Sequence, residues 1–267
     1  MGGGASRIAL RIATGITLAF IYVPIGVIIL TSFNAGLVPK WPPDGLTIDW
    51  YVKAFGDEGV RSSFLTSMQA AIGATAVALV LGSLLSFAVH RFQFFGRQTV
   101  SFLVILPIAL PGIVTGIALN TAFRTIGLDL GILTIIIGHA TFCIVVVYNN
   151  AIARLRRTAR STEEASADLG ADTGQTFRHV TLPTIGTALV AGALLAFALS
   201  FDEIIVTTFT SGAGTQTLPI WIFSNYQRPG QVPLVNVAAV LVLVLSIIPV
   251  YLAQRISASA GGVAGSR

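Results

Sequence analysis

The sequence predicts an all-α membrane protein with six transmembrane helices, and two observations lead to this fold class. Of the 267 residues, 54% are hydrophobic and only 10% are charged, which lies outside the composition of ordinary soluble domains. The apolar residues also gather in long runs that are separated by polar loops. Runs of about 18 or more apolar residues indicate spanning helices, because hydrocarbon offers no partner to an unpaired backbone amide.

Six apolar runs carry this prediction. They cover residues 12–33, 64–89, 99–121, 131–148, 185–210 and 235–253. The first run is longer than the apolar core of a signal peptide, and Thr31–Asn34 is a poor cleavage site, so we expect an uncleaved helix. The third run contains Leu106-Pro107 and Pro111-Gly112, which predict a kinked or broken helix.

Basic residues predict the orientation of the spans. Six spans place both termini and two loops on one side, and eleven of the 16 Lys and Arg residues lie there: Arg7, Arg11, Arg91, Arg97, Arg154, Arg156, Arg157, Arg160, Arg178, Arg255 and Arg267. Lys and Arg concentrate in cytoplasmic loops, so this side is predicted to be cytoplasmic. We therefore expect a cytoplasmic N-terminus over residues 1–11, a membrane domain over 12–256 and a flexible cytoplasmic tail over 257–267. The same distribution accounts for the net charge of +5 without a nucleic-acid partner.

The longest cytoplasmic loop, residues 150–183, begins with the signals of a short helix. Ser161 and Glu164 have the spacing of a capping box, in which the serine caps the helix and the glutamate reaches back. The helix is predicted over residues 162–169 and should stop at Gly170, because glycine is the usual residue after a helix end.

A second short helix is predicted directly after the first. Asp172 can cap its start, we expect it to run to about His179, and Pro183 suits the first turn of the next span. The two short helices should meet at a bend across the cytoplasmic mouth. Ala165 and Leu169 lie four residues apart on the first helix, so they predict an apolar edge that fits a socket on a partner.

The same loop resembles the EAA motif of the permease subunits of ABC importers. The family pattern is Glu-Ala-Ala, three residues, Gly, nine residues, Ile, any residue and Leu-Pro. This chain keeps every spacing with Glu164-Ala165-Ser166, Gly170, Val180 and Leu182-Pro183, and it departs only at Ser166 and Val180. The resemblance implies that the loop couples to a cytoplasmic ATPase through the following residues: Glu164, Ala165, Ser166, Asp168, Leu169, Gly170, Leu182 and Pro183. A loop that merely caps the helix bundle is the alternative.

Further segments resemble, within that family, the PotC-type permeases of spermidine/putrescine importers. They are Ser32–Asn34, His139–Cys143, Ser200–Glu203, Leu218-Pro219 and Asn236–Ala238. This resemblance implies the type I ABC importer permease fold in a bacterial inner membrane, with a cytoplasmic coupling helix between spans four and five. It also implies a pair of ABC ATPases that bind ATP and magnesium, a second, PotB-like permease and an extracytoplasmic substrate-binding protein. Relatives often carry an acid after the second proline of the third span, where this chain has Gly112.

Two adjacent acids, Asp202 and Glu203, lie inside the fifth apolar run. A charged side chain in hydrocarbon costs about 2.5–3.5 kcal/mol even on lenient scales, so we do not expect the pair to face lipid. Ser200, Glu203, Thr207 and Thr210 recur at helical spacing and predict one polar stripe. We expect Asp202, Glu203, Ser200 and Thr207 to line a pathway for a polyamine or similar organic cation. Hydrogen bonding between helices, or an ion pair with an arginine of a partner subunit, is the alternative.

The sequence predicts a transport subunit and not an enzyme. It contains no glycine-rich phosphate loop ending in Gly-Lys-Ser/Thr, so we do not expect this chain to bind ATP. His90, His139 and His179 show no metal-ligand spacing, and Cys143 is the single cysteine, so we expect no metal, cofactor or catalytic residue. Three alternatives stay open: import of another small solute such as an aminophosphonate, an ATP-independent carrier or channel subunit, and an intramembrane enzyme that uses Asp202 with His139.

Overall fold

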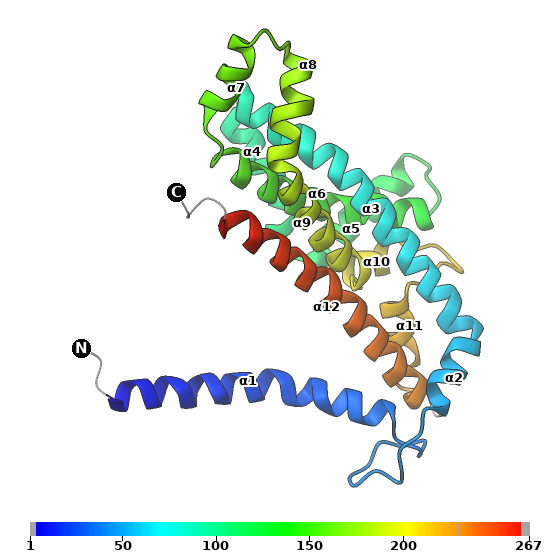
Figure 1. The fold of residues 1–267 in the computed structure, drawn as a ribbon. Coiled ribbons are helices and arrows are strands. Elements are labelled where there is room, and N and C mark those ends of the chain that lie inside the picture. The colour runs from blue at the N-terminus through cyan, green and yellow to red at the C-terminus, as the bar shows by residue number, and fades with distance from the viewer. Residues whose placement is uncertain (1–3, 229, 263–267) are drawn as a thin grey trace. The chain divides into compact units, whose positions relative to one another are not determined.

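A computed structural model describes residues 4–228 and 230–262, and the regular structure of these ranges is helical apart from one isolated antiparallel bridge between Asn34 and Leu46 (Figure 1). The helices are α1 (Gly4–Ser32), α2 (Asp49–Gly56), α3 (Glu58–Arg91), α4 (Arg97–Ala109), α5 (Gly112–Thr125), α6 (Ile132–Leu155), α7 (Arg160–Asp168), α8 (Thr173–Thr176), the π-helical turn η1 (Phe177–Thr181), α9 (Leu182–Phe201), α10 (Ile205–Thr210), α11 (Leu218–Asn225) and α12 (Val232–Gly262).

Five helices of the described ranges are long and apolar enough to cross a membrane, namely α1, α3, α6, the continuous rod of α8, η1 and α9, and α12. A sixth crossing exists if α4 and α5, which meet at an angle of 106°, together form one span. Their break lies at Leu110 and Pro111, where Leu110 adopts the extended backbone that a residue before proline favours. The predicted all-α membrane fold and the predicted break in the third apolar run are therefore confirmed.

The described residues form two compact units, and the first comprises those up to Arg61 together with Trp221–Leu243. In this unit the loop after α1 folds around Asn34, whose side chain is buried and accepts a hydrogen bond from the Asp44 N–H (3.3 Å). The indole of Trp50 on α2 donates to the Asn34 carbonyl (2.9 Å). These contacts tie the end of α1 to α2.

The second unit comprises Ser62–Ile220 and the described residues from Val244 onward, and α6 forms its centre. Gly82 of α3 and Gly192 of α9 both lie against Val147 of α6. A methyl group at Gly82 would come 3.0 Å from Val147, and one at Gly192 would come 3.3 Å from its Cα. Small residues of this kind let membrane helices approach closely, and they place α6 between α3 and α9.

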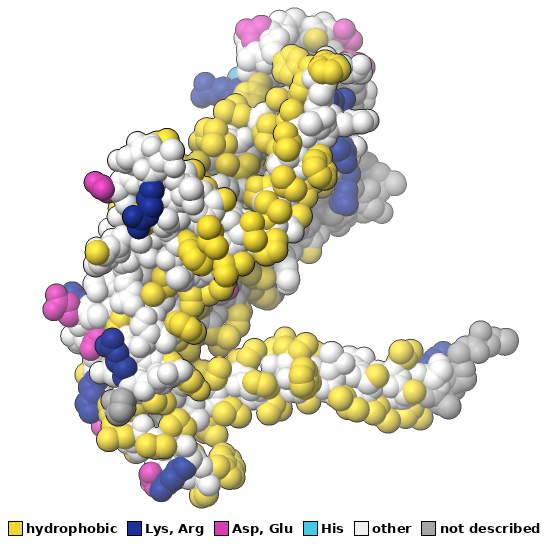
Figure 2. Space-filling model, turned by 180° about the vertical axis from the view of Figure 1, so that it is seen from behind, with side chains coloured by type: hydrophobic (Ala, Val, Ile, Leu, Met, Phe, Trp, Pro, Cys, Tyr) yellow, Lys and Arg dark blue, Asp and Glu magenta, His cyan; other side chains and the backbone are white. Residues whose placement is uncertain are grey.

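The surface of the molecule is apolar along the bodies of the helices. Figure 2 shows hydrophobic side chains along the helices, with Lys, Arg, Asp and Glu gathered in loops and near helix ends. Large exposed side chains such as Leu84 on α3, Phe102 on α4 and Ile117 on α5 contribute to this surface. Such a distribution is expected of helices whose solvent is lipid.

Several element boundaries differ from the sequence predictions. The chain is already helical at Gly4, and α12 continues to Gly262, so the first part of the expected tail is helical. Residues 1–3 and 263–267 lie outside the described residues. The sequence does not predict α2 and α11, because eight residues are too few to show a strong apolar period.

Candidate functional site

The fifth apolar run is not one continuous helix, which corrects the predicted polar stripe. Helix α9 ends at Phe201 and α10 begins at Ile205, so Asp202 and Glu203 lie in a break and not within a helix. The carboxylate of Glu203 accepts a hydrogen bond from the Val206 N–H (2.8 Å) and caps the first turn of α10. This hydrogen bond provides a partner for one of the backbone N–H groups that lack one in the first turn of a helix.

His139 of α6 bridges the break. Its ring is fully buried, with Nδ1 2.7 Å from Ser200 Oγ at the end of α9 and Nε2 2.7 Å from Thr207 Oγ1 in α10. Thr207 Oγ1 donates its single hydrogen to the Glu203 carbonyl (2.9 Å), so it accepts from the Nε2–H of His139. Nδ1 of the neutral ring then accepts from Ser200. This chain of bonds satisfies the buried polar groups and fixes both sides of the break to α6.

The two acids occupy different positions in the break. Glu203 is partly buried, and one of its oxygens is already engaged by Val206. The side chain of Asp202 is exposed. Asp202 therefore presents the more accessible carboxylate to a ligand, while Glu203 shapes the backbone beside it. The predicted residues Ser200 and Thr207 are buried: both bond to His139, and Thr207 also donates to the Glu203 carbonyl.

A second break lies against the first. Gly112 begins α5 directly after the break at Leu110 and Pro111, and a methyl group on it would lie 3.3 Å from Ile205, the first residue of α10. Farther along the same two helices, the Asn120 side-chain amide donates to the Phe209 carbonyl (2.6 Å). Discontinuous spans that meet at their breaks are the usual setting for substrate sites in transporters. Gly112 thus lies against Ile205, the second residue after Glu203.

The predicted bend in the loop over residues 150–183 is present between α7 and α8 (Figure 1). Helix α7 ends at Asp168, and Gly170 adopts a left-handed backbone with φ +85°. The N–H of Ala171 donates to the Ser166 carbonyl (3.1 Å), which is the closing bond of a Schellman motif. Glycine is favoured at this position because a Cβ atom would crowd the left-handed backbone.

The predicted cap at Asp172 is confirmed, whereas the predicted end of its helix is wrong. Asp172 Oδ1 accepts from the Gln175 N–H (2.8 Å), and Gln175 Oε1 accepts from the Asp172 N–H (2.9 Å). The helix does not stop near His179 but passes through η1 into α9. Pro183 has no N–H to donate one turn back, and the wider π-helical turn directly before it keeps the chain helical through the proline.

The first capping box is not formed. Helix α7 begins at Arg160, and Ala159 occupies the N-cap position with an extended backbone. Ser161 therefore already lies in the first turn of the helix, where it is not placed to cap with Glu164 as its partner. The chain turns into the helix two residues earlier than the pattern indicates.

The residues predicted to couple to an ATPase lie on α7, at the bend after it and in the first turn of α9. All of these residues except Ser166 are exposed: Glu164, Ala165, Asp168, Leu169 and Gly170 on α7 and at the bend, and Leu182 and Pro183 on the rod. Leu169 is 89% exposed at the bend. Ser166 points the other way, with its Oγ 3.1 Å from Thr176 Oγ1 of α8, and Leu182 and Pro183 form the first turn of α9.

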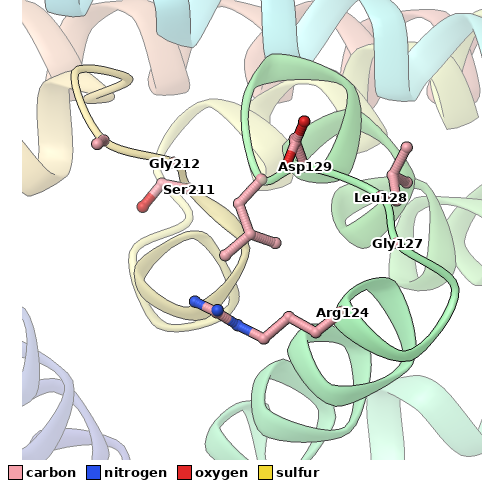
Figure 3. Close-up of a pocket in the computed structure, with 8 residues that line it drawn as sticks. Arg124, Gly127, Leu128, Asp129, Ser211 and Gly212 are labelled. Atoms are coloured by element: carbon pink, nitrogen blue, oxygen red, sulfur yellow. The ribbon is translucent and has the colours of Figure 1, made fainter.

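A surface pocket of about 490 Å³ lies at the end of α6 that is opposite to the bend (Figure 3). Arg124 and Asp129 line it from the end of α5 and the following loop, and Ser211 lines it from the loop after α10. These loops touch, because Gly212 packs directly against the Leu130 carbonyl. No sequence motif marks this pocket, since its residues come from two loops that lie far apart in the chain.

The family follows from this chain's match to known sequences. The family described as "binding-protein-dependent transport system inner membrane component" matches residues 78–260, a range that includes both breaks and the bend. The chain belongs to this family. It is thus a permease subunit of the inner membrane with several membrane-crossing helices, and not an enzyme.

Two named permeases are similar to this chain over most of their length. The putrescine transport system permease protein PotI of Escherichia coli K12 is 37% identical over 232 residues, which cover 84% of this chain and 82% of the relative. The spermidine/putrescine transport system permease protein PotC of Haemophilus influenzae is 33% identical over 242 residues, which cover 90% and 92%. The resemblance to PotC-type permeases is therefore confirmed.

Solved structures confirm the importer permease fold. A chain of a bacterial ABC transporter for import of the acidic polysaccharide alginate superposes with a TM-score of 0.73 at 17% identity, covering 96% of this permease and 98% of that chain. A chain of the MetNI methionine ABC transporter gives 0.58 at 19% identity, covering 76% and 94%. Since a polysaccharide and an amino acid differ chemically, the fold alone does not determine the solute.

Proposed function

We propose that this permease forms part of the pathway by which an ATP-driven importer moves a polyamine, such as putrescine or spermidine, or a similar organic cation across the inner membrane. The names of the relatives PotI and PotC support this class of solute. The observation that carries the proposal is the exposed carboxylate of Asp202 in the break between α9 and α10.

The chemistry of this break suits an ammonium group. A cation that leaves water needs ligands to replace its hydration, and Asp202 supplies a full negative charge. The last carbonyls of α9 add partial negative charge, because a helix C-terminus carries unpaired carbonyl groups. An anionic solute would be repelled by the same groups. In this proposal Ser200 and Thr207 act through His139, which fixes the shape of the break around Asp202 and Glu203.

The proposed importer contains three kinds of protein partner. A pair of cytoplasmic ABC ATPases binds ATP and magnesium, so this chain itself binds no cofactor. A second, PotB-like permease completes the pathway within the lipid bilayer, and an extracytoplasmic substrate-binding protein delivers the solute. The family description supports the last partner, because it names dependence on a binding protein. The alginate transporter solved in complex with a periplasmic protein gives further support.

The bend between α7 and α8 is proposed to face the cytoplasm together with both termini. Closure of the ATPases would push on the exposed face around Ala165 and Leu169, and Gly170 would keep the bend in shape. Helix α8 is continuous with α9, whose far end is the break at Asp202, so a tilt of this rod would reach the solute site directly. Rigid-body tilting of this kind would switch the pathway between outward and inward access.

Neutralising both acids is expected to lower polyamine uptake about tenfold, which corresponds to the loss of one charged contact of roughly 1.4 kcal/mol. The double variant Asp202→Asn with Glu203→Gln suits this test, because a glutamine oxygen still accepts from Val206. Uptake of labelled putrescine and spermidine is measured in proteoliposomes with the complete importer. Asp202→Asn alone should account for most of the loss.

The matched control neutralises two exposed acids outside the break, with Asp49→Asn and Glu58→Gln in one variant. Its uptake should equal that of the unaltered protein. Unchanged polyamine uptake in the Asp202 and Glu203 variant would contradict a cation pathway at the break and favour another solute, such as an aminophosphonate. Uptake that continues without ATP would instead favour an ATP-independent carrier.

A cysteine at the tip of the bend should crosslink to an ATPase subunit. Leu169→Cys replaces an exposed side chain, so the change leaves the fold intact. We expect a short bifunctional reagent to give a covalent adduct with the ATPase, identified by mass spectrometry. The matched control, Leu84→Cys on the exposed apolar surface of α3, should give no adduct. Absence of the Leu169 adduct in an active importer would refute the coupling role.

A further inference from the structure

The inner face of α7 is polar. Among the α7 residues whose side chains the structure describes, only Glu163 and Ser166 are partly buried. They lie three residues apart and share one face of the helix, whereas the motif residues Glu164 and Leu169 are exposed. Polar contacts therefore hold α7 to the rest of the unit, in place of a packed apolar face.

Glu163 contacts two other elements at once. Its Oε1 accepts a hydrogen bond from Thr181 Oγ1 of η1 (2.7 Å), and its Oε2 lies 3.5 Å from Arg91 Nη1 at the end of α3. The contact of Ser166 with Thr176, by contrast, stays within the bend. Glu163 thus joins α7 both to α3 and to the rod that ends at the break.

A cavity of about 580 Å³ lies beside these contacts. His90, Arg91 and Arg97 line it from the corner between α3 and α4, and Glu163 and Thr181 line it from the bend and the rod. Because this space is open, packing does not fix the distance between α7 and α3. The two contacts of the Glu163 carboxylate span this space and connect α7 to α3 and to the rod.

We propose that Glu163 is a positioning residue for coupling. Its carboxylate holds the bend to α3 through Arg91 and to the rod through Thr181, so a push on the outer face of α7 displaces both helices together. This inference rests on the proposed function, in which that outer face meets an ATPase. Glu163 lies directly before the Glu164-Ala165-Ser166 motif and is not part of it, and it shares the inner face of α7 with Ser166, whereas Glu164 and Ala165 are exposed.

The two contacts differ in strength, which sets the order of the expected effects. The ion pair with Arg91 is long and its side chains are 41% and 27% exposed, so solvent screens it. The hydrogen bond to Thr181 is short and ends on a buried threonine. Loss of the carboxylate would leave that buried hydroxyl without this partner, and such losses are more costly than screened ion pairs.

The test measures the amount of putrescine imported per ATP hydrolysed by the reconstituted importer. Glu163→Ala removes both contacts and should lower this ratio about tenfold, while basal ATP hydrolysis and the amount of assembled complex stay unchanged. Glu163→Gln retains an acceptor for Thr181 and should lower the ratio less. Thr181→Val should lie between the two variants. If Glu163→Ala lowers the amount of assembled complex, the ratios measured with Glu163→Gln and Thr181→Val test the inference in its place.

A change at Arg91 separates the two contacts of Glu163. Arg91→Gln removes only the screened ion pair and leaves the hydrogen bond from Thr181, so it should lower the ratio less than Glu163→Ala does. Glu58→Ala makes the same type of substitution at the other end of α3 and should leave the ratio unchanged. A normal ratio in Glu163→Ala would overturn the inference.

Crosslinking distinguishes failure of this inference from failure of the proposed function. If Leu169→Cys crosslinks to the ATPase and Glu163→Ala keeps the normal ratio, only the inference about Glu163 is refuted. If Leu169→Cys does not crosslink in the otherwise unaltered importer, the coupling role of the whole bend is refuted. Retained crosslinking with a lowered ratio in Glu163→Ala supports both.

Discussion

Gly170→Asp is expected to abolish import while the protein still folds and inserts. Aspartate tolerates a left-handed backbone better than most residues, so the φ of +85° should cost only about 1 kcal/mol. The new carboxylate, however, stands at the bend between Asp168 and Asp172. At an interface it would have to lose its water beside like charges, which costs several kcal/mol. Import should fall below detection, and ATP hydrolysis should continue without transport.

Glu164→Lys should have the same consequence through charge reversal on the outer face of α7. Both variants are measured for import, for ATP hydrolysis and for the amount of complex in the membrane. The matched control is Gly214→Asp, which adds the same side chain at another left-handed glycine, with φ +79° and open space around it. That variant should transport normally. Normal import in Gly170→Asp would show that the bend does not enter a partner surface.

Local signals predict the bend well. Asp172 and Gln175 lie three residues apart, and Gly170 stops the preceding helix, so neighbouring residues alone specify this turn. The sequence also predicts the break at Pro111, because proline restricts both its own backbone and that of Leu110. Gly170 and Pro111 are predicted correctly because they act through their own backbone geometry, whereas the capping signal of Ser161 with Glu164 fails because α7 begins two residues earlier.

Sequence reasoning misses the break at Asp202 because the polar residues around it keep a helical spacing. Ser200 and Thr207 would share one face of an intact helix, and no glycine or proline interrupts them. What decides their geometry is His139, which lies on another helix and meets both hydroxyls. A contact between residues so distant in the chain leaves no periodic signal. The same holds for Glu163 with Arg91.

His139→Leu is expected to destabilise the protein and to lower polyamine uptake together. The substitution removes two buried hydrogen bonds between helices, and such bonds in membrane proteins contribute about 0.6 to 1.7 kcal/mol each. The summed loss of about 1 to 3 kcal/mol should appear as a lower thermal unfolding midpoint in detergent. Uptake should fall because α9 and α10 are no longer fixed to α6 on both sides of Asp202.

His139→Gln separates the hydrogen bonds of His139 from its volume, and His179→Leu serves as a control. His139→Gln can donate to Thr207 and accept from Ser200 through its amide, so it should retain more stability and uptake than His139→Leu. His179→Leu alters an exposed histidine outside the break and should leave the unfolding midpoint unchanged. If His139→Leu keeps full uptake despite a lower midpoint, the bridge stabilises the core without shaping the solute site. If uptake falls with Leu and recovers with Gln, the bridged break is the element that presents Asp202 to the cation.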